Sequence, residues 1–161
     1  MPARTASPRS ARTAPRRSAI PRTLLIAARA FDERLDAERV AEAIAAGLRD
    51  GGWEADPCPI DGAEESAAVR SLTQSSDFDA RMRAARAVVI AEPRLAEDTL
   101  AGTVAFEIAT SARQAGVPAY AVTGENRLDS FDARILDLQT ILQARAHRSL
   151  RAAGRKLAKL V

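Results

Sequence analysis

Short, continuous apolar segments alternate along the chain with segments of mixed polarity. The clearest apolar runs lie at residues 23–28, 87–91 and 117–122, and weaker ones lie at 53–59 and 136–142. Uninterrupted apolar runs of this length are typical of parallel strands that helices cover on both faces. We therefore predict five strands at these positions.

The intervening segments have the periodicity of amphipathic helices. Asp36, Asp77 and Asp98 are predicted to start three of them, and glycines at 51–52 and 116 are predicted to end two. A fourth helix is predicted at the end of the chain. The apolar faces of the four are Val40, Ile44 and Leu48; Phe78, Met82 and Ala85; Leu100, Val104, Ile108 and Ala112; and Leu150, Ala153, Leu157 and Leu160. This alternation predicts an α/β fold: a single Rossmann-like, doubly wound parallel sheet with the flavodoxin-like strand order 2-1-3-4-5.

Residues 1–22 differ in composition from the rest of the chain. They hold six arginines, four prolines and no acid. Such a segment buries too little apolar surface to offset chain entropy, so we predict a disordered tail at 1–22 and a folded domain at 23–161. The whole chain has a net charge of +3, and the tail contributes its six arginines to that value, so the net charge of the domain is −3. That balance disfavours a nucleic-acid-binding face on the domain and leaves only weak binding through the tail.

Composition and motifs disfavour several other classes of protein. The single cysteine excludes an intrachain disulfide, and Cys58 is interpreted as buried packing. The single histidine, His147, excludes a His-rich metal site and is expected away from the loops that follow the strands. The apolar run Leu24–Ala28 is too short to cross a membrane, and the tail lacks the apolar stretch of a signal peptide, so a cytoplasmic protein is expected. Neither a G-x-G-x-x-G nor a G-x-x-x-x-G-K-[ST] motif occurs.

Ligands of doubly wound sheets bind beyond the carboxyl ends of the strands, here in the loops 28–36, 60–66, 91–98 and 123–130. In the second of these loops, Asp61 and Glu64 are candidate catalytic residues and candidate Mg²⁺ ligands. Neighbouring Glu65 adds a third carboxylate. The alternative interpretation is that these acids favour the start of the next helix.

The last two loops hold the candidate substrate-binding residues. Glu92 and Arg94 flank Pro93, and Arg94 can hold a carboxylate or a phosphate with two hydrogen bonds, or the two residues can pair with each other. Gly124 and Asn126 tolerate a positive φ, so with Glu125 they predict a tight turn that presents backbone N–H groups. A plain turn before a helix explains the same residues equally well.

Four segments, taken together, resemble the type I glycerate kinase family from about residue 23 to residue 160. They read LLIAARAFDERLDAERVAEAIAAGLRDGG, CPIDGAEES, FDARMRAARAVVIAEPRLAEDTLAG and AGVPAYAVTGENRLDSFDARILDLQTIL. The first resembles the family's A-P-D-S-F-K-G loop and its flanking elements, the second its D-G-G-E-G-T motif, and the third its T-G-E-G-R-L-D-x-x-T-L-x-G-K motif. The resemblance implies ATP-dependent phosphorylation of glycerate, with ATP and Mg²⁺ as cofactors.

Several family positions hold different residues in this chain. In the first motif, Arg29 occupies the position of the family's acid and Asp32 the position of its lysine. In the second motif, Glu65 occupies the position of the glycine that follows the acid. In the third motif, Ala96 occupies the position of the family's aspartate and Thr103 the position of its later lysine. The family's second domain is expected to be missing between residues 66 and 76.

These departures predict a truncated pseudoenzyme that is impaired or inactive by itself. The alternatives are a non-catalytic ligand-binding or assembly module and one half of a split glycerate kinase. Glycerate or a nucleotide is the expected small-molecule ligand. A second copy or a partner chain is expected over the loops 28–36 and 60–66, because loss of a covering domain exposes apolar surface.

Overall fold

Five parallel strands form one sheet in a computed structural model that describes residues 20–62 and 64–161. The strand order is β2-β1-β3-β4-β5, as predicted. The strands are β1 (Thr23–Ala28), β2 (Glu54–Pro59), β3 (Ala87–Leu95), β4 (Ala119–Asn126) and β5 (Leu138–Gln143). The helices are α1 (Ala37–Asp50), α2 (Glu65–Thr73), α3 (Ser76–Ala84), α4 (Val104–Ala115), α5 (Ser130–Ile135) and α6 (His147–Leu157), with a 3₁₀ turn at Glu97–Thr99.

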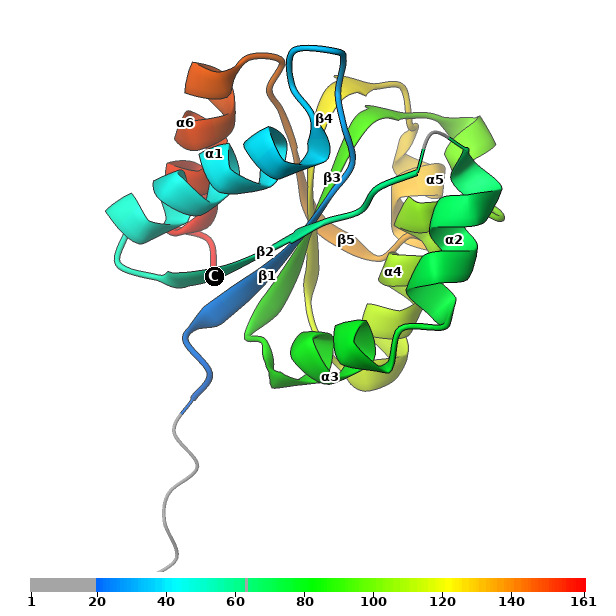
Figure 1. Cartoon of the computed structure of the whole chain (residues 1–161), viewed down its shortest axis with the longest axis horizontal. Coiled ribbons are helices and arrows are strands. Elements are labelled where there is room, and N and C mark those ends of the chain that lie inside the picture. The colour runs from blue at the N-terminus through cyan, green and yellow to red at the C-terminus, as the bar shows by residue number, and fades with distance from the viewer. Residues whose placement is uncertain (1–19, 63) are drawn as a thin grey trace, which may run out of the picture.

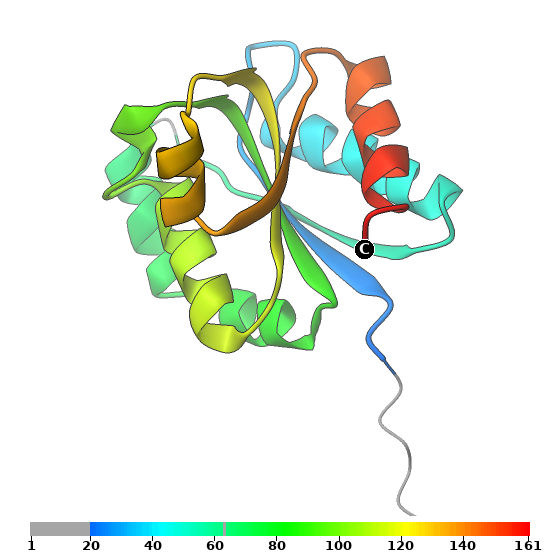
Figure 2. The ribbon, with the colours of Figure 1, turned by 180° about the vertical axis from the view of Figure 1, so that it is seen from behind.

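Helices cover both faces of the sheet, so the fold is doubly wound. The helices α1 and α6 lie on one face, and α2, α3, α4 and α5 lie on the other (Figures 1 and 2). Successive residues of a strand point to opposite faces. In β1, Leu24 and Ile26 therefore pack under α1 and α6, whereas Leu25 and Ala27 pack under α2, α3 and α4.

Local capping residues set the helix ends. Asp36 caps α1 and accepts a hydrogen bond from the backbone N–H of Arg39 at 2.8 Å, as predicted. Gly116 ends α4 in the left-handed conformation that glycine adopts without strain. Two predicted starts are wrong by a few residues. Ser75, not Asp77, caps α3. Asp98 lies within the 3₁₀ turn, and Thr103 caps α4.

Replacement of the α1 cap should cost a modest amount of stability. We expect Asp36→Ala to lower the free energy of unfolding by about 1 kcal/mol, since the N–H of Arg39 loses its acceptor. Urea unfolding measures the change. Glu38→Ala removes an exposed acid from the first turn of the same helix and should change stability by less than about 0.5 kcal/mol. Equal losses in both variants would contradict a role for the cap.

The boundaries of the predicted segments need four corrections. The strands β3 and β4 continue through residues 92–95 and 123–126, which were expected to be loops. Leu160 lies beyond the end of α6 and is exposed, so it does not belong to the predicted helical face. The prediction of a disordered tail falls mostly outside the described residues. Its last residue, Arg22, donates a hydrogen bond to the carbonyl of Gly52 and lies over the Trp53 ring, so it belongs to the folded domain.

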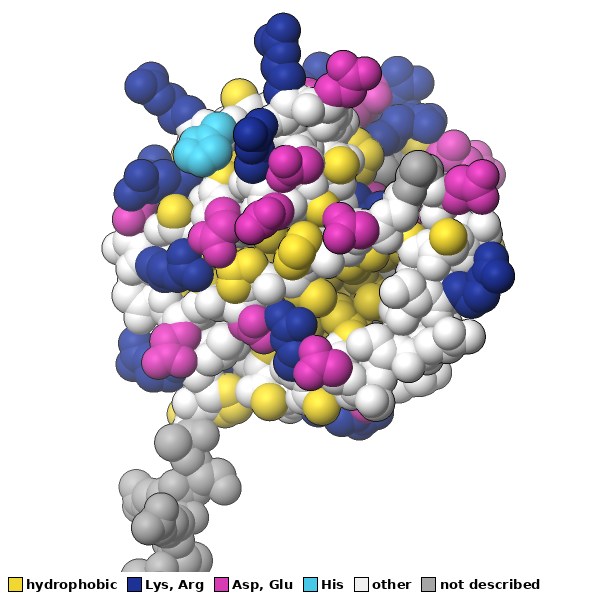
Figure 3. Space-filling model, in the orientation of Figure 1, with side chains coloured by type: hydrophobic (Ala, Val, Ile, Leu, Met, Phe, Trp, Pro, Cys, Tyr) yellow, Lys and Arg dark blue, Asp and Glu magenta, His cyan; other side chains and the backbone are white. Residues whose placement is uncertain are grey.

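The surface agrees with a domain of mixed charge. On the face shown in Figure 3, basic and acidic side chains are interspersed rather than segregated. Within the described part of the chain, no helix is both long and apolar enough to span a membrane.

Candidate functional site

The carboxyl edge of the sheet brings most of the predicted site residues together. Glu92 and Arg94 lie on β3, and Gly124, Glu125 and Asn126 lie on the adjacent strand β4. Register pairs Arg94 with Glu125 and Leu95 with Asn126. Asp61 and Glu64 lie elsewhere along the same edge, in the connection between β2 and α2. The five predicted substrate-binding residues therefore lie on two adjacent strands, and the two candidate metal ligands lie in the connection after β2.

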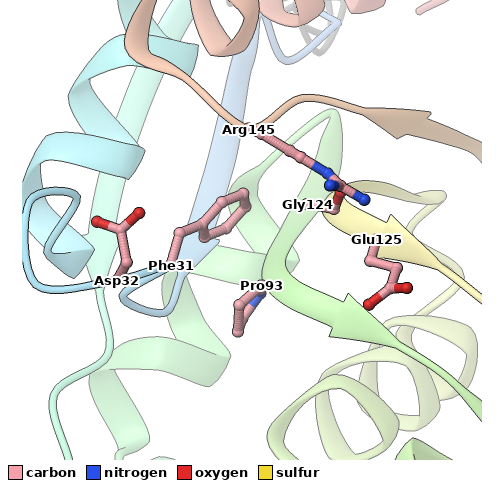
Figure 4. A pocket seen from close by; sticks show the side chains of 6 residues that line it. All are labelled: Phe31, Asp32, Pro93, Gly124, Glu125 and Arg145. Carbon is pink, nitrogen blue, oxygen red and sulfur yellow. The ribbon is translucent and has the colours of Figure 1, made fainter.

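A cavity of about 270 Å³ opens at this edge. Phe31 and Asp32 reach it from the connection after β1, and Arg145 reaches it from the connection after β5 (Figure 4). The carboxylates of Asp32 and Glu125 lie at opposite ends of it. The residues that line it are Phe31, Asp32, Pro93, Gly124, Glu125 and Arg145.

Gly124 has a different role from the one predicted. It lies within β4 and does not have a positive φ, so the predicted tight turn is wrong. A Cβ atom at this position would lie 2.6 Å from the carbonyl oxygen of Pro93 and 3.6 Å from the Phe31 ring. Glycine is therefore needed because neighbouring backbone approaches the floor of the cavity closely. Asn126 stabilises the chain after β4, since its side-chain oxygen accepts a hydrogen bond from the N–H of Leu128.

The arginines beside the cavity make contacts with protein groups. Arg94 pairs with Asp98 at 3.3 Å and approaches Glu125 at 4.0 Å, and does not pair with Glu92. Arg127 donates a hydrogen bond to Glu125 at 2.6 Å, and this bond is the main reason that the pKa of Glu125 is lowered. The Nε–H of Arg145 donates to the carbonyl of Gly124. Much of the positive charge at the cavity is therefore balanced within the protein.

A buried acid lies where strand order reverses, between β1 and β3. Glu92 is 8 % exposed, and its Oε1 atom has no hydrogen-bond partner. Burial raises the pKa of Glu92 to about 8, while the positive charge of Arg29 opposes the rise and the negative charge of Glu65 adds to it. Arg29 donates to Glu65 at 2.7 Å and to the carbonyl of Gly62 at 3.2 Å. Sequence patterns identified Glu92 but indicated neither its burial nor its two charged neighbours.

The described residues do not build a metal site from protein groups alone. Asp61 and Glu64 are exposed, and Glu64 makes no side-chain capping bond to α2. Among the residues that the structure describes, no group of three or more His, Cys, Asp or Glu side chains could hold a metal ion. Mg²⁺ can also be bound through one or two carboxylates and substrate phosphates. The assignment of Asp61 and Glu64 as catalytic residues and Mg²⁺ ligands therefore stays a prediction.

Asp32 lies where the resemblance implies a lysine. Its Oδ1 atom accepts hydrogen bonds from the backbone N–H groups of Arg34 and Leu35, at 2.8 and 2.9 Å. The carboxylate thus fixes the turn that precedes α1 and also borders the cavity. A carboxylate at this place repels phosphate groups, whereas a lysine would attract them.

The two remaining candidate side chains lie outside the cavity. Cys58 is partly buried, burial raises the pKa of its thiol, and Arg81 contacts the sulfur, which agrees with a packing role. His147 is the first residue of α6 and follows Arg145 by two residues. The helix α6 follows β5 and starts at the carboxyl edge of the sheet, and the separation of His147 from the four predicted loops stays a prediction.

Solved structures with a similar fold belong to flavodoxin-like proteins and an oxidoreductase. An oxidoreductase from Corynebacterium diphtheriae is 14% identical with a TM-score of 0.50, and the match covers 89% of this chain and 98% of that one. The diflavin flavoprotein A3 from Nostoc sp. is 14% identical with a TM-score of 0.47, covering 87% and 93%. The flavodoxin-like domain of a Synechococcus sp. protein is 15% identical with a TM-score of 0.46, covering 86% and 96%. Identities this low show the fold alone.

Comparison by sequence identifies the family. No curated protein matches the chain significantly. The sequence profile of the glycerate kinase family matches residues 51–160, which is more than half of the chain and includes β2 to β5. The chain belongs to the glycerate kinase family.

Proposed function

We propose that this domain binds a small hydroxy acid such as glycerate in the cavity beside Asp32 and does not by itself transfer phosphate to it. The observation that carries the proposal is the set of polar side chains on the cavity wall. Asp32 and Glu125 supply acceptors for hydroxyl groups, and Arg145 supplies a cation for a carboxylate. A volume of about 270 Å³ suits a ligand of a few heavy atoms better than a nucleotide.

Phosphoryl transfer depends on positioning and on stabilisation of phosphate charge. Lys156 and Lys159 are the only lysines of the chain, and neither lines the cavity. Arg94 and Arg127 are balanced by Asp98 and Glu125. The connection from β2 to β3 consists of two nine-residue helices that pack close to the sheet, with no inserted domain between them. These features support binding without efficient turnover.

Ligand binding at the proposed site should depend on Arg145. Isothermal titration with glycerate should detect binding to the wild type, and Arg145→Met should weaken it at least tenfold through loss of a charge-assisted contact. Binding to the wild type that is absent, or unchanged in Arg145→Met, would contradict the assignment of this cavity. Asp129→Asn, which changes a charge in the cap of α5 outside the cavity, serves as the matched control.

The purified chain should release ADP from ATP, Mg²⁺ and glycerate far more slowly than 1 per second, the lower end of the usual range for kinases. A coupled ADP-release assay measures this rate. Turnover of about 1 per second or faster, abolished by Asp61→Ala or Arg94→Ala, would show a working enzyme and would support the predicted catalytic site instead. Asp32→Asn retains an acceptor for the turn and removes the charge, so it should bind ATP more tightly than the wild type does.

Association with a second copy or a partner chain over the loops 28–36 and 60–66 stays a prediction. The large apolar side chains that are exposed among the described residues are Ile20, Phe131, Ile135 and Leu160. None of them belongs to either loop.

A further inference from the structure

The carboxylate of Glu65 is held as a bound anion would be. Glu65 is the first residue of α2, and its Oε2 atom accepts a hydrogen bond from Arg29 at 2.7 Å. Its Oε1 atom accepts one at 2.6 Å from the backbone N–H of Val104, the first residue of the twelve-residue helix α4. A guanidinium together with a free N–H group at a helix N-terminus is an arrangement that binds carboxylates and phosphates.

The carboxyl group of Glu92 is a further polar group that interacts with Arg29 and Glu65, and one of its oxygen atoms has no hydrogen-bond partner. Glu92 is 8 % exposed, its Oε1 atom has no partner, and Arg29 and Glu65 are the two charged residues that act on its carboxyl group. Because its pKa is about 8, Glu92 carries a proton at pH 7 and has an O–H group to donate. A buried polar atom without a partner costs free energy, so an additional ligand oxygen here would be stabilised.

We propose that Arg29, the N-terminus of α4 and Glu92 form a binding site for a small oxyanion, and that the side chain of Glu65 occupies this site as an internal carboxylate. The site lies between β1 and β3, where ligands of doubly wound sheets bind. It is separate from the cavity beside Asp32, since none of its groups lines that cavity. The inference therefore does not depend on the proposed hydroxy-acid function.

The two partners differ in how easily they can move. The side chain of Glu65 is 41 % exposed, so it can turn into solvent when an anion takes its place beside Arg29. The side chain of Arg29 is 13 % exposed and is also bound to the carbonyl of Gly62, so it stays in place. An incoming anion would take over the hydrogen bonds from Arg29 and Val104. Its apparent affinity is reduced in the wild type because it must compete with an intramolecular group.

Titration of the full chain with inorganic phosphate at pH 7 and low ionic strength tests the proposal. Glu65→Ala should bind phosphate at least tenfold more tightly than the wild type, and Glu65→Gln, which retains an acceptor for Val104, should show a smaller gain. The double variant Arg29→Met/Glu65→Ala should lose the gain. Acetate is titrated in parallel, and whichever anion binds more tightly identifies the natural ligand as a phosphate or a carboxylate.

A matched control separates a specific site from a general change in charge. Glu107→Ala removes a carboxylate from the first turn of α4 itself, where it has no contact with Arg29 in the described structure, and should change phosphate binding by less than twofold. The proposal is overturned if folded Glu65→Ala and Glu65→Gln bind no more tightly than the wild type. An equal gain in Glu107→Ala, or a gain that persists without Arg29, overturns it as well. No nucleotide or glycerate is present, so these results are independent of the tests of the proposed function.

Discussion

Gly154→Ala should lower the free energy of unfolding by about 3 kcal/mol, even though alanine favours helices over glycine. Gly154 lies on α6 where this helix crosses α1. A Cβ atom there would meet the carbonyl oxygen of Ile44, lie 2.9 Å from the Cα of Gly47 and lie 3.0 Å from the backbone nitrogen of Leu48. All three atoms belong to the backbone of α1, so no side chain can rotate away to make space.

The two helices would have to separate to admit the extra methyl group. Gly47 on α1 has the same constraint, since its Cβ would meet the backbone of Arg151 on α6. Separation would loosen the packing of Leu150 and Leu157 against Ile44 and Leu48, which are all fully buried. Overpacking of a core costs about 1 to 3 kcal/mol or more, and a contact between rigid backbones lies at the upper end of that range.

The sign of the effect distinguishes packing from helix propensity. If α6 were loosely packed, Gly154→Ala would raise stability by about 1 kcal/mol through propensity alone. Ala152→Gly, at an exposed position of the same helix, should lower stability by about 1 kcal/mol and serves as the control for propensity. Urea unfolding of the three proteins measures these differences. A Gly154→Ala variant as stable as the wild type would show that the helices do not approach as closely as the structure indicates.

The sequence predicted the fold because its signals are local and repeated. The apolar runs at 23–28 and 87–91 and the cap at Asp36 each require only a few neighbouring residues to be recognised. The strand ends were harder to predict because the polar residues after Ala91 have no strand pattern. They are extended because β3 continues to pair with β4 after β1 has ended at Ala28. Pro93 is tolerated there because the side of β3 that faced β1 needs no further N–H group.

The candidate site was predictable in position but not in detail. Strand topology placed the site at the carboxyl edge, where Asp32 and Glu125 line the cavity. Arg145 was not predicted because it lies in the connection after β5, outside the four predicted binding loops. The pair formed by Arg29 and Glu65 joins residues 36 positions apart, and the N–H of Val104 is 39 positions from Glu65. No local pattern indicates contacts of this kind, since they depend on how α2 and α4 pack.

Glu92→Gln should remove a large part of the pH dependence of stability. The folded protein binds a proton on Glu92 with a pKa of about 8, whereas the group has an ordinary pKa near 4.5 when burial is lost. Between these two values the folded state retains a proton that the unfolded state has released. The contribution of Glu92 to stability therefore falls as the pH rises from about 5 to 8, because the folded protein must either hold a proton on Glu92 or bury its negative charge. Above the pKa of Glu92 in the folded state, this group no longer changes the free energy of unfolding with pH.

The size of the effect follows from the difference between the two pKa values. Each pKa unit corresponds to 1.36 kcal/mol, so the contribution of Glu92 changes by roughly 3 kcal/mol between pH 5 and pH 8. Glutamine resembles the protonated acid in shape and cannot ionise, so the variant should gain stability relative to the wild type by roughly this amount over that range. Urea unfolding at pH 5, 6, 7 and 8 measures the difference. Glu97→Gln, the same change at an exposed position on the same edge, should retain the pH dependence of the wild type. If the free energy of unfolding depended on pH in the same way for the wild type and Glu92→Gln, Glu92 would be ionised in the folded protein and its carboxylate would have a partner.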